Sequence, residues 1–351
     1  MIAPRIGIVG CGFIANLHSR ALRGVLQAGH ADGSVVAVCD VDRARAEAFA
    51  RVWSADVVAD PFELVRGVDA VWICTPTSSH RALVEEAAGA GTAIFCEKPL
   101  ATALADAEAM AAAVAAAGVP NQVGLVLRTS PAYGAIADLL ASGAYGAPMA
   151  VVFRDDQYFP NQGQYGSAWR ADVSVAGGGT LIEHSIHDLD VLRMLLGEVT
   201  TVSAATANHA GHVGVEDVAV ATLRFASGAT ASLSSVWHQV LSRPSTRYLE
   251  VFCEKAVVAC GNEYTGPLTI TTDAGLEERA CPQPAWVGEL PVADPWRTAV
   301  GPYAVQARAF LDALASGAPA FPGLDVAVEA HRVADAVYRS AAAGGAPLPL
   351  A

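Results

Sequence analysis

The stretch from residue 6 to residue 15, IGIVGCGFIA, decides the fold of the first part of the chain. Its first four residues predict a short buried strand, and the turn G-x-G-x-x-A that follows leads into a helix expected over residues 16–26. Gly10 allows the tight turn, Gly12 lets a pyrophosphate approach the backbone, and Ala15 lets the helix pack closely on its strand, so the stretch predicts a dinucleotide-binding fold with the pyrophosphate at the helix N-terminus. The predicted cofactor contacts of this turn are Gly10, Gly12, Phe13, Ile14 and Ala15.

Asp40 follows the second expected strand, Ser34–Cys39. A carboxylate at this position accepts the adenosine ribose hydroxyls and repels a 2′-phosphate, which favours NAD over NADP. Its distance from the glycines exceeds the usual spacing of about 20 residues, and we interpret residues 24–33 as a loop extension. Arg43 is placed either to contact a 2′-phosphate or to lie on the surface, so NADP stays possible.

The rest of the first part alternates strands with helices. This alternation predicts an α/β Rossmann domain with a doubly wound parallel sheet over residues 1–123. The further strands are expected at Asp56–Val58, Ala70–Cys74, Ala93–Cys96 and Gln122–Leu127, and the helices between them include Arg43–Val52 and His80–Ala90.

Polar residues follow two of these strands, at the sheet edge where ligands bind in open α/β folds. Pro99 restricts Lys98 to an extended conformation, and a cis peptide there would direct Lys98 toward the cleft. The cofactor-side residues predicted from these strand ends are Thr75, Pro76, His80, Glu97 and Lys98.

A second distinctive stretch, GGGTLIEHSIHDLDVLRMLLG, covers residues 177–197. It predicts a helix that is capped by Thr180 and ends at Gly197. Glu183 and His187 are four residues apart and therefore share a helix face, which suits a proton-handling pair. On its own, such a pair is more often a surface ion pair or a core histidine.

Composition limits the partners. The 351 residues suggest two domains, and a net charge of −13 without a basic run argues against nucleic acid and anionic membrane surfaces. Seven scattered cysteines indicate reduced thiols and neither a disulfide framework nor a metal site. No charged and apolar leader precedes the strand at Arg5, and the longest apolar run, Met110–Gly118, is about half of what a bilayer requires. We therefore expect a soluble, cytoplasmic protein with a small-molecule substrate.

The motifs G-x-G-x-x-A, TPTSSH, EKPL, WRAD and GGGTLIEHSIHDLD follow one another in this chain. In their order and approximate spacing the chain resembles, over nearly its whole length, the glucose-fructose oxidoreductase/inositol dehydrogenase/rhizopine-catabolism (Gfo/Idh/MocA) oxidoreductases. The resemblance implies that Lys98 hydrogen-bonds the reacting hydroxyl or carbonyl and that His187 is the general acid/base. Glu183 stands where many members have aspartate, and Ser185 where glycine is common, so the third catalytic role falls to Glu183 with a longer side chain and His184 is placed to share its work.

The remaining residues predict an α+β domain over residues 124–351, with a large, mostly antiparallel open sheet and closing helices that pack back on the first domain. The polar, aromatic loop at residues 159–172 suits a sugar site, and residues 282–302 are expected to form a long loop. The resemblance implies that the sheet mediates a homodimer or homotetramer. The predicted substrate contacts are Lys98, Arg128, Trp169, Arg170, Glu183, His184 and His187, and the expected strands are Met149–Tyr158, Val199–Ala207, Val215–Phe225, Ala229–Val240, Thr246–Cys253, Ala256–Cys260 and Leu268–Thr272.

These features together predict an NAD-dependent oxidation of a secondary alcohol on a sugar, sugar derivative or cyclitol, with Lys98 and His187 as the acid/base pair. Two enzymatic alternatives stay open, an NADP-dependent ketosugar reductase and an NAD-assisted glycoside hydrolase of the same fold. A cofactor-binding regulator without turnover is the third, and the acid/base set argues against it.

Overall fold

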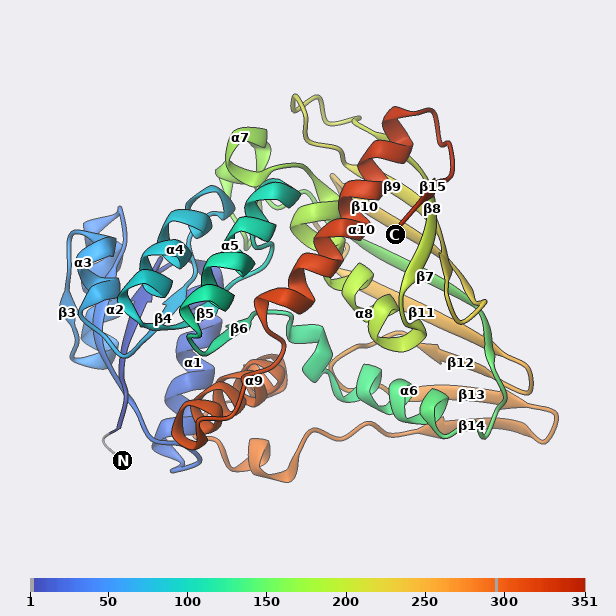
Figure 1. Cartoon of the computed structure of the whole chain (residues 1–351). Helices are drawn as coiled ribbons and strands as arrows, with labels where there is room; N and C mark the ends of the chain where they lie inside the picture. The colour runs from blue at the N-terminus through green and yellow to red at the C-terminus, as the bar shows by residue number, and fades with distance from the viewer. Residues whose placement is uncertain (1–2, 294–295, 351) are drawn as a thin grey trace. The chain divides into compact units, whose positions relative to one another are not determined.

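The computed structural model describes residues 3–293 and 296–350 (Figure 1). The chain divides into two compact units, Met1–Val126 with Pro284–Val328, and Leu127–Gln283 with Glu329–Ala351. The first unit is therefore discontinuous in sequence, because a helix near the C-terminus returns to it.

Over the described residues, the first unit has a parallel sheet of six strands in the order β3-β2-β1-β4-β5-β6. The order reverses direction beside β1, as in a doubly wound fold. The strands are β1 (Arg5–Val9), β2 (Ser34–Cys39), β3 (Asp56–Val57), β4 (Ala70–Ile73), β5 (Ala93–Cys96) and β6 (Asn121–Val123). The helices are α1 (Phe13–Gln27), α2 (Arg43–Trp53), α3 (Pro61–Arg66), α4 (His80–Ala90), α5 (Leu104–Ala117) and α9 (Trp296–Ser316).

Each face of this sheet has its own apolar core. On one face, side chains of α3, α4 and α5 pack together, among them Leu64, Leu83 and Met110. On the other face, α1, α2 and α9 pack on the strands, and Phe310 of α9 contacts the ring of the fully buried Trp72. α9 thus completes the second layer of the Rossmann unit.

Over the described residues, the second unit has a sheet of nine strands in the order β14-β13-β12-β11-β7-β10-β9-β8-β15. Every neighbouring pair is antiparallel except β7 with β10. Figure 1 shows α6, α8 and the later part of α10 on the same side of this sheet. The elements are α6 (Pro131–Ala141), β7 (Pro148–Tyr158), α7 (Val173–Ala176), α8 (Ile186–Leu196), β8 (Val199–Ala207), β9 (Val218–Phe225), β10 (Thr230–His238), β11 (Thr246–Cys253), β12 (Val257–Cys260), β13 (Leu268–Thr272), β14 (Gly275–Arg279), α10 (Leu324–Ala342) and β15 (Leu348–Pro349).

The start of the second distinctive stretch differs from its prediction. Residues Leu181–Ser185 form a π-helical turn, and the α-helix proper begins at Ile186. Thr180 makes no side-chain cap, because its hydroxyl is hydrogen-bonded to the Ser235 hydroxyl at 2.7 Å. The helix does end at Gly197, whose φ is +88°.

Further expectations were wrong in detail. Residues 24–27, interpreted as part of a loop extension, are helical, because α1 runs to Gln27. The strand expected over residues 122–127 ends at Val123, because Leu125 N bonds back to Val123 O in a tight turn that buries the same apolar side chains. The loop expected over residues 282–302 contains a 3₁₀ turn, Ala285–Glu289, and the first turns of α9; Asp294 and Pro295 lie outside the described residues. Strands β14 and β15 escaped prediction, since exposed β14 carries no alternation and β15 contains Pro349.

Candidate active site

The glycine turn of the first unit is locked to the end of β2. Cys11 N donates to Asp40 Oδ2 at 2.7 Å, and Asp42 N donates to Asp40 Oδ1 at 2.8 Å. Gly10 has a φ of +87°, and a Cβ there would lie 2.6 Å from Cys74 O. The structure thus brings together the two features from which dinucleotide binding was predicted.

The residues present fit a bound dinucleotide. A Cβ built on Gly12 would meet nothing within 4 Å, so space is open beside the turn. The N-cap residue of α1 is Gly12, which has no side chain that could shield the helix N-terminus from a phosphate. The buried Thr75 Oγ1, just past β4, has no hydrogen-bond partner within residues 3–293 and 296–350, as expected of a group that serves a ligand.

Lys98 sits in a rigid setting at the end of β5. Its backbone N donates to Glu97 Oε2 at 3.1 Å, and the Lys98–Pro99 peptide bond is cis. The other Glu97 oxygen pairs with His18 Nε2 of α1 at 2.6 Å, and both side chains are buried. A Cβ on Gly124 would lie 2.4 Å from the Glu97 carboxylate, so a glycine there makes the room that Glu97 occupies.

His80, at the start of α4, spans two backbone segments of the predicted cofactor side. Its Nδ1 lies 2.9 Å from Pro99 O and its Nε2 lies 2.9 Å from Thr75 O. The imidazole therefore ties the chain past β4, including Pro76, to the chain past β5. Cofactor contact by His80 stays a prediction.

In the second unit, the predicted carboxylate of the site is an ion-paired group. Glu183 lies in the π turn with its side chain 1% exposed, and its Oε2 accepts from Arg170 Nε at 3.1 Å. The Arg170 guanidinium also stacks over the Trp169 ring, 4.4 Å from its centroid. The structure thus joins the WR motif to the helix motif.

His187 occupies the first turn of α8 and is buried, with 7% of its surface exposed. His184 Nε2 lies 3.1 Å from both Asp155 Oδ1 and Arg247 Nη2. Substrate contact by His184 and by His187 stays a prediction.

Arg247 of β11 is the centre of a buried charge cluster that the sequence did not reveal. It donates to Asp188 at 2.8 Å, to Asp155 at 3.3 Å and to Glu263 at 3.2 Å. Asp155 and Asp188 are fully buried. Burial and then the neighbouring Asp155 charge raise the pKa of Asp188 to about 7, while Arg247 opposes the shift.

Arg128, predicted to contact substrate, makes a two-pronged ion pair. Its Nε and Nη2 each donate to an Asp190 oxygen at 2.7 Å. Asp190 is buried, and its pKa is raised by desolvation and opposed by Arg128. This geometry holds α8, and substrate contact by Arg128 stays a prediction.

Comparison with known proteins decides the family. A model described as an oxidoreductase family with an NAD-binding Rossmann fold matches residues 4–125, and a model of the GFO/IDH/MocA C-terminal domain matches residues 133–259. The chain belongs to the Gfo/Idh/MocA oxidoreductases. It is therefore an NAD-dependent enzyme, as its motifs predicted.

Relatives cover most of this Gfo/Idh/MocA chain. The inositol 2-dehydrogenase of Rhizobium meliloti is 31% identical over 96% of this chain and 97% of its own length. A D-apiose dehydrogenase of Paraburkholderia graminis is 35% identical over 77% of this chain and 68% of its own. Among solved structures, an oxidoreductase domain protein from Kribbella flavida has a TM-score of 0.87 at 24% identity over the whole of both chains, which shows the shared fold.

Some structural features were out of reach of the motifs. His18, Asp155, Glu216 and Arg247 are buried polar residues that lie far in sequence from the groups they hold. Each of them stands beside other polar residues in the sequence, so no local pattern singles it out. In the described part of the chain, no helix is long and apolar enough to cross a membrane, and no cluster of side chains is suited to a metal ion.

Proposed function

We propose that this Gfo/Idh/MocA enzyme oxidises a secondary alcohol of a sugar, sugar derivative or cyclitol. Lys98 and His187 contact the reacting hydroxyl, and Glu183 positions His187 and the substrate. The relatives named above as inositol 2-dehydrogenase and D-apiose dehydrogenase support this substrate class. NAD, when bound, supplies the acceptor for the hydride that leaves the carbinol carbon.

The observation that carries the proposal is the buried set on one helical segment of the second unit. His187 is shielded from water, and the buried side chain of Glu183, four residues earlier, is ion-paired with Arg170. A shielded imidazole on this segment takes the hydroxyl proton as the C–H bond breaks, and the alcohol becomes a ketone. The Lys98 ammonium stabilises the negative charge that develops on the oxygen.

Glu97 and Arg170 have supporting roles in this proposal. Glu97 holds the Lys98 backbone, and Arg170 fixes the Glu183 carboxylate by donating to its Oε2. Trp169, stacked on Arg170, presents an aromatic surface of the type that packs on sugar rings. Asp40 selects NAD through the ribose hydroxyls, and His184 and Arg128 lie next to the same helix as candidate substrate contacts.

The test is NADH or NADPH formation at alkaline pH, followed by near-ultraviolet absorbance, with each oxidised cofactor and a panel of inositols, aldoses and glycosides. Reduction of NAD by one member, lost in Lys98→Met and in His187→Asn, is the expected result. Silence with every alcohol while NAD binds by calorimetry would refute the proposed direction and favour ketone reduction or NAD-assisted hydrolysis.

We also propose that the outer face of the nine-stranded sheet pairs with a second copy of the chain. Val152 of β7 and Val220 of β9 expose large apolar side chains there, and exposed apolar groups on one face suit an interface. Light scattering after size exclusion tests this, with a Val152→Lys variant expected to shift the mass toward the monomer. The seven reduced, buried cysteines suit a reducing compartment, and the cytoplasm stays the proposed location.

A further inference from the structure

The segment that carries Glu183 and His187 is fixed at its start by a residue from a distant loop. Gly179 N donates to Glu216 Oε2 at 2.7 Å, Leu181 N donates to Glu216 Oε1 at 2.9 Å, and Thr180 N donates to the Glu216 backbone oxygen at 2.9 Å. A helix start leaves backbone N–H groups without intrahelical partners. Glu216, just before β9, satisfies three of them in place of a local cap.

The glycines before the helix are shaped around this anchor. A Cβ on Gly179 would lie 1.8 Å from the Glu216 backbone oxygen, and a Cβ on Gly178 would lie 2.5 Å from the Tyr338 hydroxyl. Neither distance is compatible with a side chain. The GG pair therefore serves the close approach of Glu216 and Tyr338, as well as breaking the preceding structure.

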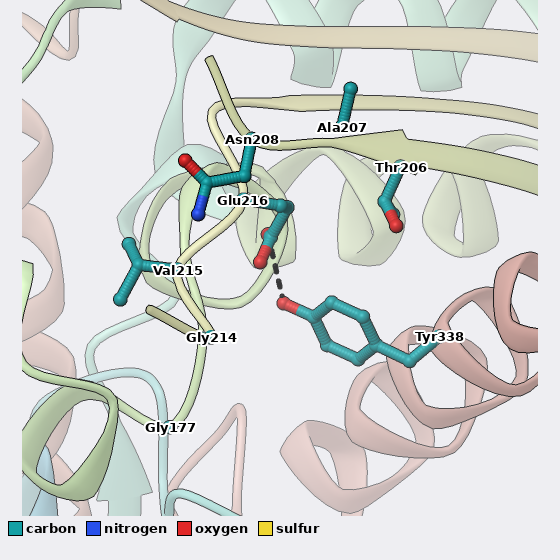
Figure 2. Close-up of a pocket in the computed structure, with 9 residues that line it drawn as sticks. Gly177, Thr206, Ala207, Asn208, Gly214, Val215, Glu216 and Tyr338 are labelled. Carbon is teal, nitrogen blue, oxygen red and sulfur yellow. Dashed lines mark hydrogen bonds between the residues drawn. The ribbon is translucent and has the colours of Figure 1, made fainter. Parts of the chain in front are cut away.

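Tyr338 of α10 completes the anchor. Its hydroxyl donates to Glu216 Oε1 at 3.0 Å, the contact drawn as a dashed line in Figure 2. Burial raises the pKa of Tyr338 well above its ordinary value, so the phenol stays a donor. Burial also raises the pKa of Glu216, and the hydrogen bonds from Leu181, Gly179 and Tyr338 oppose that rise by stabilising the carboxylate.

We propose that Glu216 is a positioning residue for the reaction. Its three backbone contacts set the depth and rotation of the π turn, and with them the placement of Glu183 and of the His187 imidazole. A displacement of about 1 Å at a reacting group costs roughly 100-fold in rate, so a loosened helix start lowers turnover without touching the substrate. This inference rests on the proposed role of His187, and the experiment below separates the two.

Two variants weaken the anchor with little steric change. Glu216→Gln keeps one side-chain oxygen as an acceptor but places its amide N–H groups opposite a backbone N–H of residue 179 or 181. Tyr338→Phe deletes the hydroxyl that donates to Glu216. A hollow of about 400 Å³ borders both side chains, together with Gly177, Thr206 and Asn208, so neither change crowds its surroundings (Figure 2).

Asp217 offers the matched control. Its carboxylate is also buried and also accepts backbone N–H groups, from His209 and Ala210, but it does not contact the helix start. Asp217→Asn therefore costs stability in the same loop while it leaves the anchor intact. His187→Asn is the reference for loss of chemistry.

The measurements are kcat and KM with NAD and the most active alcohol of the panel, and amide hydrogen exchange of residues 177–187. Glu216→Gln is expected to lower kcat roughly 10- to 100-fold with KM for NAD within about twofold. Exchange at Gly179 and Leu181 speeds up in Glu216→Gln, less in Tyr338→Phe, and not in Asp217→Asn.

Wild-type kcat in Glu216→Gln with an inactive His187→Asn would overturn the inference, as would an equal fall in kcat in Asp217→Asn. If His187→Asn keeps its turnover, the proposed function fails instead. Unchanged amide exchange in Glu216→Gln overturns the anchor whatever the substrate.

Discussion

Asp188→Asn is expected to stabilise the protein at neutral and alkaline pH. Asp188 is fully buried beside Asp155, and Arg247 contacts both of these carboxylates and Glu263. His184, which contacts Asp155 and Arg247, and Tyr133 also face this cluster. An asparagine keeps the oxygen that accepts from Arg247 Nε and gains an N–H for Asp155. The substitution therefore removes one buried negative charge and no hydrogen bond.

The sign and size follow from the pKa of Asp188, which rises from 3.8 to about 7 on folding because burial and the Asp155 charge disfavour the anion. Between these values the native state holds a proton that the unfolded chain has lost, so the wild type loses stability as pH rises through this window. Three pKa units correspond to about 4 kcal/mol of unfolding free energy. The advantage of the variant is thus near zero at pH about 4, grows by about 1.4 kcal/mol per pH unit and levels off above pH about 7.

Urea unfolding of both proteins between pH 5 and pH 8, followed by tryptophan fluorescence, measures this difference. Asp60→Asn is not a suitable control because Asp60 caps α3. Asp273→Asn is the control, because Asp273 lies in an exposed hairpin turn and its substitution should leave the unfolding free energy unchanged. A stability difference between wild type and Asp188→Asn that does not change with pH would show that Asp188 is ionised throughout, and the reasoning would fail.

Three further predictions concern the cofactor side and the helix start. Burial, followed by the Asp40 charge, raises the pKa of the Cys11 thiol to about 12. N-ethylmaleimide at pH about 8 should therefore leave Cys11 of the folded protein unlabelled, as measured by mass spectrometry. Labelling of Cys11 at the rate of an unfolded chain would contradict this prediction. Gly179→Ala is expected to prevent folding or to lower Tm strongly in a thermal melt, because the added Cβ would overlap the Glu216 carbonyl. In the same assay, Gly89→Ala in α4 should raise the unfolding free energy by about 0.5 kcal/mol, because its Cβ would meet no atom within 4 Å. In steady-state kinetics, Asp40→Ala should raise KM for NAD about 10-fold or more and lower the ratio of kcat/KM for NAD to kcat/KM for NADP. An unchanged ratio would show that Asp40 does not select the cofactor.

Local sequence patterns sufficed for most of the first unit. The glycine turn, the strands β2, β4 and β5 and the helices between them follow from short-range apolar periodicity and from glycine and proline positions. Prediction failed at residues 122–127, because a strand and a turn with buried apolar side chains give the same run of apolar residues. It also failed at β14, because an exposed edge strand has no alternation of apolar and polar residues. The return of α9 to the first unit has no local signal, because it depends on which apolar surface was left uncovered.

The second unit shows a different limit. The sequence placed Glu183, His184 and His187 on one helical segment, and the match to the family's C-terminal domain spans this segment. The π turn was not predictable, because it depends on backbone N–H groups that are satisfied by Glu216 from another loop. Periodicity assumes a constant rotation per residue, and a distant hydrogen-bond acceptor changes that rotation without changing the pattern of apolar residues.

The helix motif also explains why its polar residues resist interpretation from sequence alone. Glu183 pairs with Arg170, Asp188 with Arg247 and Asp190 with Arg128, so one buried segment carries three carboxylates, each with an arginine from a different element. An arginine favours the charged form of a buried carboxylate, and this effect is weaker where several carboxylates share one arginine. Glu183 has Arg170 to itself among the described ion pairs, whereas Asp188 shares Arg247 with Asp155 and Glu263. The number of carboxylates on each arginine, which only the fold reveals, therefore helps to explain why burial and the Asp155 charge raise the pKa of Asp188 to about 7.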